Sequence, residues 1–164
     1  MLVVAAMLAI LATVSLPIFA ATFKNARLSG AVRQLASDIR SARSLAVSKG
    51  GFYGVHSGRD PAIGDPSLYN SYRIEYSTNG TTWPAATATM GSDPGVIMNW
   101  ENLSTQFTGV TVQSVVDGSA VAIGGPIFNA MGASVDSSNI RSVNITLIDD
   151  KVIQVSPAGN VKMP

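Results

Sequence analysis

The first 23 residues of the chain contain no charged side chain. The residues outside the apolar set in this run are Thr13, Ser15, Pro17 and Thr22. As an α-helix, the run would be roughly 34 Å long, enough to cross the hydrocarbon layer of a bilayer. We therefore predict that residues 1–23 span a membrane or lie in a bundle of apolar helices. Proline removes a backbone hydrogen bond, so we expect a kink or a local opening near Pro17.

Residues 24–49 continue the helical pattern, but with one apolar face. Apolar side chains recur three or four residues apart, which is typical of a helix that packs one side on a core. These positions are Leu28, Val32, Leu35, Ile39, Ala42 and Ala46. Gly50 and Gly51 then end the helix. We predict one helix from Met1 to about Ser48, divided into an apolar segment (1–23) and an amphipathic segment (24–49), followed by a β-rich head (50–164).

The head is rich in glycine, serine and asparagine, and it contains short β-prone runs. Residues 72–76 alternate in the manner of a strand, and Asn79-Gly80 predicts a hairpin turn directly after them. Further strands are expected at residues 96–100, 110–116, 120–123, 143–147 and 152–155, with Asp149-Asp150 as a tight turn. No second long helical pattern occurs in the sequence. The predicted fold class is α+β, with an antiparallel sheet covering the apolar face of the long helix.

Charge is distributed unevenly between the helix and the head. Residues 24–49 hold six basic residues and one acidic residue, whereas residues 50–164 hold five basic and nine acidic residues. The basic side chains could form a solvated helix face or contact lipid head groups. Alternatively, they could contact the acidic head of a neighbouring subunit. The candidate electrostatic contacts are Lys24, Arg27, Arg33, Arg40 and Arg43.

The composition excludes several kinds of chemistry. The chain has no cysteine, so disulfides, zinc–thiolate sites, iron–sulfur clusters and cysteine nucleophiles are ruled out. The one histidine, His56, is followed by Ser57 and Asp60, but no nucleophile-elbow motif accompanies them. We expect His56 to be a surface residue, and we predict no enzyme activity, no catalytic residues, no cofactor and no small-molecule substrate.

Three aspartates near the C-terminal strands raise the possibility of a calcium site. Asp149 and Asp150 are adjacent, and Asp136 precedes them. A tight turn explains the adjacent pair, and the EF-hand pattern is absent, so no metal site is predicted.

The sequence of residues 1–17 resembles the N-terminal helix of bacterial type IV pilins and type II secretion pseudopilins. Residues 32–49, 127–132 and 152–161 are similar to the branch of H-type minor pseudopilins and FimT-like pilins. The resemblance implies a pilin-like fold and a structural subunit of a pilus or pseudopilus filament. In this family a basic leader ending in glycine precedes a methylated phenylalanine and a glutamate at the fifth mature position. We expect that the sequence given begins after that glutamate.

The resemblance also implies a location and partners. The subunit would sit in the bacterial inner membrane with its head in the periplasm, then join an extracellular pilus or a periplasmic pseudopilus. Its partners would be copies of itself or other pilins, and the small residues of the first segment would permit close helix packing. The predicted filament-core residues are Leu2, Val3, Val4, Ala5, Ala6, Leu8, Ala9, Ile10, Leu11, Ala12, Val14 and Leu16.

Two alternatives to a structural filament subunit remain open. One is a monomeric, single-span envelope protein whose β domain binds a ligand. The other is a DNA-uptake minor pilin, which in this family carries an arginine-rich C-terminal motif. Here Lys162 is the one cation after Gly159. Phosphate binding depends on several clustered cations, so we do not expect nucleic acid to be a partner.

Overall fold

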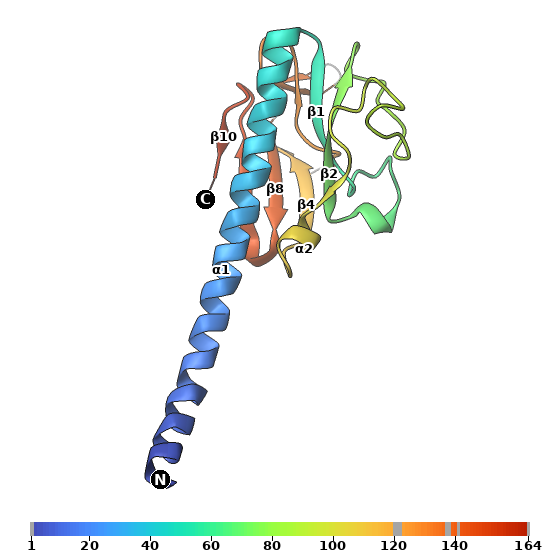
Figure 1. Ribbon diagram of the computed structural model, residues 1–164. Coiled ribbons are helices and arrows are strands. Elements are labelled where there is room, and N and C mark those ends of the chain that lie inside the picture. The colour runs from blue at the N-terminus through green and yellow to red at the C-terminus, as the bar shows by residue number, and fades with distance from the viewer. Residues whose placement is uncertain (1, 120–122, 137–138, 141, 164) are drawn as a thin grey trace.

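One long helix dominates the molecule and extends well beyond the head (Figure 1). The computed structural model describes the backbone of residues 2–119, 123–136, 139–140 and 142–163, and within them the side chains other than those of residues 2–18, 20, 136, 139–140 and 150. Helix α1 spans Leu2–Lys49 and is assigned without a break through Pro17. The kink there therefore stays a prediction. Gly50 ends α1 in a left-handed conformation (φ 72°), which glycine adopts without steric cost.

The head contains two antiparallel sheets rather than the one expected. The six-stranded sheet has the order β3-β2-β1-β5-β6-β7, with bounds Glu101–Asn102, Ser71–Ser77, Phe52–Ser57, Ile127–Phe128, Ser134–Asp136 and Asn139–Ile140. The four-stranded sheet has the order β10-β9-β8-β4, with bounds Val161–Lys162, Lys151–Val155, Val143–Leu147 and Val112–Asp117. Short helices occupy Pro66–Leu68 (η1), Leu103–Gln106 (α2) and Ile148–Asp150 (η2).

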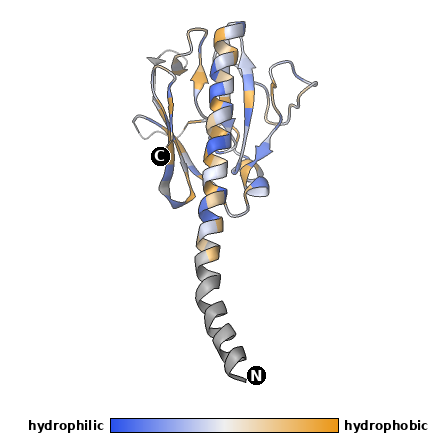
Figure 2. Cartoon of the chain, turned by 60° about the vertical axis from the view of Figure 1, so that its left-hand side comes forward, coloured by the Kyte–Doolittle hydropathy of each residue, from blue (hydrophilic) through white to orange (hydrophobic). Residues whose placement is uncertain are grey.

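The core lies between the second half of α1 and strands of both sheets. All six stripe positions, Leu28, Val32, Leu35, Ile39, Ala42 and Ala46, are buried. Helix α1 contacts β1 and β5 of the six-stranded sheet and β9 and β10 of the four-stranded sheet. Figure 2 shows α1 crossing the head with strands on either side of it. A helix with one apolar stripe is thereby held along most of its second half.

Gly30 has a packing role that its low helix propensity does not suggest. A Cβ at this position would lie 2.7 Å from the Phe107 ring. The missing side chain therefore lets Phe107 pack directly on the backbone of α1. This contact brings the segment after α2 against the helix.

Two of the predicted strand features are wrong. The Asn79-Gly80 turn does not join β2 to a following strand, because β2 pairs with β1 and β3 instead. The Asn79 side chain accepts hydrogen bonds from the backbone N–H groups of Thr81 and Thr82, which closes a local turn inside a long loop. Residues 96–100 are not a strand either, because they contribute one isolated bridge, Glu75 to Val96.

The C-terminal strands follow the prediction more closely. Residues 143–147 form β8 and pair with β9 at Lys151–Val155. Between these strands, Asp149 adopts a left-handed conformation (φ 58°) that a tight turn requires. The strand expected at 120–123 falls mostly on residues 120–122, which lie outside the described residues.

Candidate functional site

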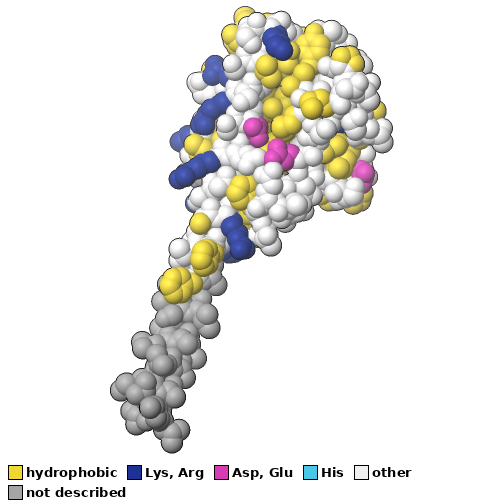
Figure 3. All heavy atoms as spheres, viewed as in Figure 1, with side chains coloured by type: hydrophobic (Ala, Val, Ile, Leu, Met, Phe, Trp, Pro, Cys, Tyr) yellow, Lys and Arg dark blue, Asp and Glu magenta, His cyan; other side chains and the backbone are white. Residues whose placement is uncertain are grey.

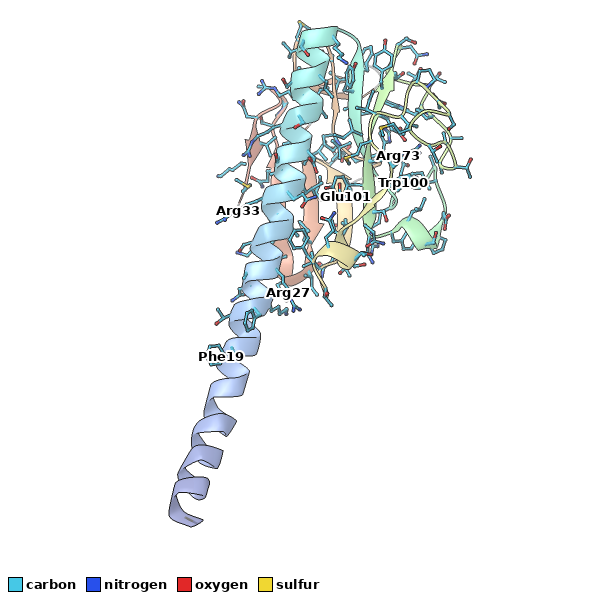
Figure 4. The ribbon with its side chains drawn as sticks, viewed as in Figure 1. Phe19, Arg27, Arg33, Arg73, Trp100 and Glu101 are labelled. Atoms are coloured by element: carbon cyan, nitrogen blue, oxygen red, sulfur yellow. The ribbon has the colours of Figure 1, made fainter. Side chains whose placement is uncertain are left out.

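The predicted filament-core residues, Leu2 to Leu16, and Pro17 have side chains that lie outside the described residues. In the residues whose side chains the structure describes, no helical stretch is long and apolar enough to cross a membrane. Near the end of the apolar segment, Phe19 is 61% exposed and Phe23 is 60% exposed. Figure 4 shows Phe19 on the part of α1 that extends beyond the head, whereas Phe23 borders a hollow that Gly109 and Ile148 of the head also line.

Three of the five candidate cations contact groups in their own chain. The Lys24 ammonium lies 2.8 Å from an Asp149 carboxylate oxygen, and both side chains are about half exposed. Arg40 donates a long hydrogen bond (3.4 Å) to the carbonyl of Val161. An exposed ion pair such as Lys24–Asp149 stabilises a fold by roughly 0–1 kcal/mol.

Arg43 holds two C-terminal loops against α1. Its Nε donates to the carbonyl of Gly132 (3.0 Å), and its Nη2 donates to the carbonyl of Ala158 (2.9 Å). A Cβ on Gly159 would lie 1.9 Å from the Gly132 carbonyl oxygen and 2.8 Å from the Arg43 Nε. The guanidinium thus sits where two glycine backbones approach closely, and its planar donors match the carbonyls.

Four exposed cations line one side of α1, and we call them the basic flank: Arg33, Arg40, Lys151 and Lys162. Arg33 and Lys151 border the same hollow of about 240 Å³ beside Met163. Figure 3 shows basic side chains gathered along this side of the helix. Within the described part of the chain, none of these four cations forms an ion pair with a carboxylate.

Two carboxylates lie on the other side of α1, and we call them the acidic flank: Asp38 on the helix and Glu101 on β3. The Tyr72 hydroxyl donates to Asp38 (2.6 Å), and the Gln34 amide donates to Glu101 (2.7 Å). Burial raises the pKa of Asp38 above its ordinary value, opposed by the Tyr72 hydrogen bond and assisted by the Glu101 charge. Figure 4 places Glu101 and Arg33 on opposite sides of the helix.

A buried charge network lies inside the head, and sequence reasoning missed it. His56 is buried at 6% exposure, so the prediction of a surface histidine is wrong. Its Nδ1 lies 3.6 Å from an Asp60 oxygen and its Nε2 lies 3.7 Å from a Glu75 oxygen, while the Trp83 ring covers it at 4.4 Å. The reason is that residues 52–57 form a central strand, β1, whose glycine lets the imidazole pack against the backbone.

Arg73 joins this network to the loop that covers β2. Its Nε donates to Glu75, and its Nη1 and Nη2 donate to four backbone carbonyls at 2.9–3.3 Å. These carbonyls belong to Pro84, Ala85, Ala86 and Ala88. The Trp100 ring lies 4.6 Å from the guanidinium carbon, and its Nε1 donates to the carbonyl of Ala86 in the same loop; Figure 4 shows Arg73 and Trp100 close together. All five N–H donors of the guanidinium therefore have acceptors.

Burial raises the pKa of Glu75, while the charges of His56 and Arg73 act in the opposite direction. The contact with the His56 imidazole lowers the pKa of Asp60. Arg73 and Glu75 thus form an ion pair inside the head, and His56 and Asp60 lie beside it. The strand pattern gave no sign of this, because Arg73 and Glu75 occupy alternate positions that ordinarily face water.

This network does not form a hydrolytic triad. His56 and Ser57 are neighbours on β1, so their side chains point to opposite faces of the sheet. The Ser57 hydroxyl instead accepts a hydrogen bond from the backbone of Arg59. A cavity of about 370 Å³ borders His56, Asp60 and Trp83.

The calcium alternative is not tested by the structure. No metal-ligating group of three or more His, Asp or Glu residues occurs in the described part of the chain. Asp149 is paired with Lys24, and the side chains of Asp136 and Asp150 lie outside the described residues.

The chain is similar to solved structures of other proteins, although it matches none by sequence. No family model matches the chain. No curated protein matches it significantly. The type IV minor pilin FimU of Pseudomonas aeruginosa PAO1 aligns at 17% identity and a TM-score of 0.49, over 85% of this chain and 90% of FimU. The minor pseudopilin EpsH of the Vibrio cholerae type 2 secretion system aligns at 9% identity and a TM-score of 0.56, over 84% of this chain and 94% of EpsH. The chain therefore has the pilin-like α+β fold seen in EpsH, a long N-terminal helix packed on antiparallel sheets.

Proposed function

We propose that this chain is a structural subunit of a type IV pilus or of a type II secretion pseudopilus. The observation that carries the proposal is the uncharged run of residues 1–23, of which residues 2–23 belong to the same helix that packs on the head. The pilin-like fold supports it. The resemblance of residues 32–49 to minor pseudopilins favours a minor-pilin or pseudopilin role, with copies of the chain or other pilins as its neighbours. We assign the protein no catalytic role.

The physical reason is the apolar surface of the first segment. About 23 helical residues without charge cannot remain in water, so they need either lipid or other apolar helices. We infer that residues 1–23 anchor the subunit in the inner membrane before assembly and pack in the filament core afterwards. Residues 24–49 then connect this core to the head, which would lie in the periplasm or outside the cell. Alanines in the first segment, such as Ala5 and Ala9, would let neighbouring helices approach closely.

A charge placed in the apolar segment tests this proposal. We expect full-length Ala9→Asp to be absent from sheared filaments, because a carboxylate in a bundle of apolar helices is costly. The head should stay folded, as near-UV circular dichroism would report. The matched control is Val47→Asp, which adds the same charge to the same helix at a position that is 56% exposed. Normal incorporation of Ala9→Asp would overturn the proposal.

The purified protein and the sheared filaments also distinguish the proposed filament subunit from the two alternative functions. A single-span envelope protein would remain monomeric in detergent and would be missing from every filament fraction. A DNA-uptake pilin would bind DNA with a strong salt dependence that weakens when Lys162 is neutralised.

A further inference from the structure

The two flanks of α1 carry opposite charges that no ion pair among the described residues compensates. On the basic flank, Arg33 and Lys151 border one hollow, and Arg40 lies beside β10. On the acidic flank, Asp38 and Glu101 accept hydrogen bonds from the uncharged groups of Tyr72, Gln34 and Gln106. Among the described residues, no cation forms an ion pair with either carboxylate.

The acidic flank is in an environment that disfavours its charges. Asp38 is half-buried, and both burial and the neighbouring Glu101 charge raise its pKa. Figure 3 shows apolar side chains beside the acidic ones on this side of the helix. A cation brought against these carboxylates would interact with them in a medium less polar than water, where the attraction is stronger than on an open surface. The flank is therefore suited to receive a positive side chain from outside.

We propose that the basic flank of one subunit docks on the acidic flank of a second copy of the chain, with Arg33 and Arg40 against Asp38 and Glu101. The two arginines are seven residues apart, so they lie on one side of α1, roughly 10 Å from each other. This inference rests on the proposed filament function, and it names the surface through which the heads and the head-packed part of α1 associate.

The partner that docks on each flank is a second copy of the chain, because each flank presents the charge that the other lacks. The flanks lie on opposite sides of one helix, so the contact joins two different surfaces and leaves one flank free on each subunit. A contact of this type repeats without closing and generates a helical polymer. A two-fold dimer would instead place like charges against each other. The apolar segments below the heads could pack in the same repeat.

Cysteine cross-linking tests the contact directly, because the natural chain contains no cysteine. Full-length Arg33→Cys and full-length Glu101→Cys would be prepared separately, mixed in detergent, reconstituted into phospholipid vesicles and oxidised. We expect a disulfide-linked dimer from the mixture, and at least about tenfold less from either variant alone. The matched control pairs Lys49→Cys, which is also exposed on α1, with Glu101→Cys. Equal dimer formation by Arg33→Cys alone would indicate a two-fold contact and overturn the inference.

A charge swap tests whether the attraction is electrostatic. We expect Arg33→Glu or Glu101→Arg alone to reduce cross-linking, measured between cysteines placed at Arg40 and Asp38, by about tenfold, because each puts like charges together. The double variant should recover to within about twofold of the parent pair. A merely structural loss in either single variant would not be rescued, so a double variant as poor as the singles overturns the inference.

The results distinguish this inference from the proposed function. If filaments contain the chain and depend on Ala9, but neither cross-linking nor the swap behaves as described, the flank contact is wrong and the filament role stands. If the chain neither enters filaments nor self-associates, both are wrong.

Discussion

The Arg73 network offers the sharpest test of what holds the head together. Its guanidinium has five N–H donors, and the structure supplies five acceptors: four loop carbonyls and the Glu75 carboxylate. Arg73→Lys keeps the charge but offers three donors from one atom, so at least two acceptors lose their partner. An acceptor left unsatisfied in a buried site costs about 1–3 kcal/mol. We therefore expect Arg73→Lys to lower the free energy of unfolding by about 3 kcal/mol.

Arg73→Met should cost more, because it leaves the buried Glu75 without its cation. Breaking a buried ion pair by removing one partner costs about 3–5 kcal/mol. The double variant Arg73→Met/Glu75→Gln should recover part of that loss, since the uncompensated charge is gone. The assay is urea unfolding of the full chain in mild detergent, followed by tryptophan fluorescence. Trp83 and Trp100 both lie in this network, so the signal reports on it. If Arg73→Lys lowered the free energy of unfolding by less than about 1 kcal/mol, the claim that the guanidinium satisfies four buried loop carbonyls would be refuted.

Three further predictions concern α1 and its contacts. Ile39→Ala should lower the free energy of unfolding by about 2–5 kcal/mol, because Ile39 is fully buried (0% exposed) and its loss leaves a cavity; calorimetry would check this. Gly159→Ala should loosen the C-terminal loop from α1, since φ is 77° and a Cβ would meet the Gly132 carbonyl at 1.9 Å; faster amide exchange at residues 156–160 would report it, and unchanged exchange would contradict it. For Asp38, a raised pKa in the folded chain means that its contribution to stability falls as pH rises above the ordinary value of 3.8. Asp38→Asn should therefore gain stability relative to wild type between about pH 4 and pH 7 and not below pH 3.5, as unfolding curves at each pH would measure.

The parts of the fold that follow from local periodicity could be predicted. The stripe from Leu28 to Ala46 has a helical spacing, and the structure buries every member. Strands β8 and β9 and the turn at Asp149 likewise follow from alternation and from two adjacent aspartates. In these segments, local preference and tertiary packing agree, so the sequence is sufficient.

The parts that depend on long-range contacts could not be predicted. The pattern at Arg73 and Glu75 is that of a solvent-facing strand, and only the loop containing residues 84–88 turns this face into an interior. His56 lies two residues after Gly54 in a glycine-containing segment, and the pairing of β1 with β2 and β5, together with the Trp83 ring, buries it. For Arg43 the sequence left open a solvated helix face or a contact with a neighbouring subunit, and in the structure two carbonyls more than 80 residues away accept hydrogen bonds from its guanidinium. Such contacts leave no periodic trace in the sequence.

The central claim is that the apolar segment of α1 assembles with copies of itself rather than remaining dispersed in lipid. Helical reconstruction from electron cryomicroscopy of filaments sheared from the producing cells tests this most directly. We expect density for this chain in the fibre, with residues 1–23 packed along the axis and the head on the outside. Fibres that lack the chain, together with a full-length protein that stays monomeric in detergent at all concentrations, would contradict the claim.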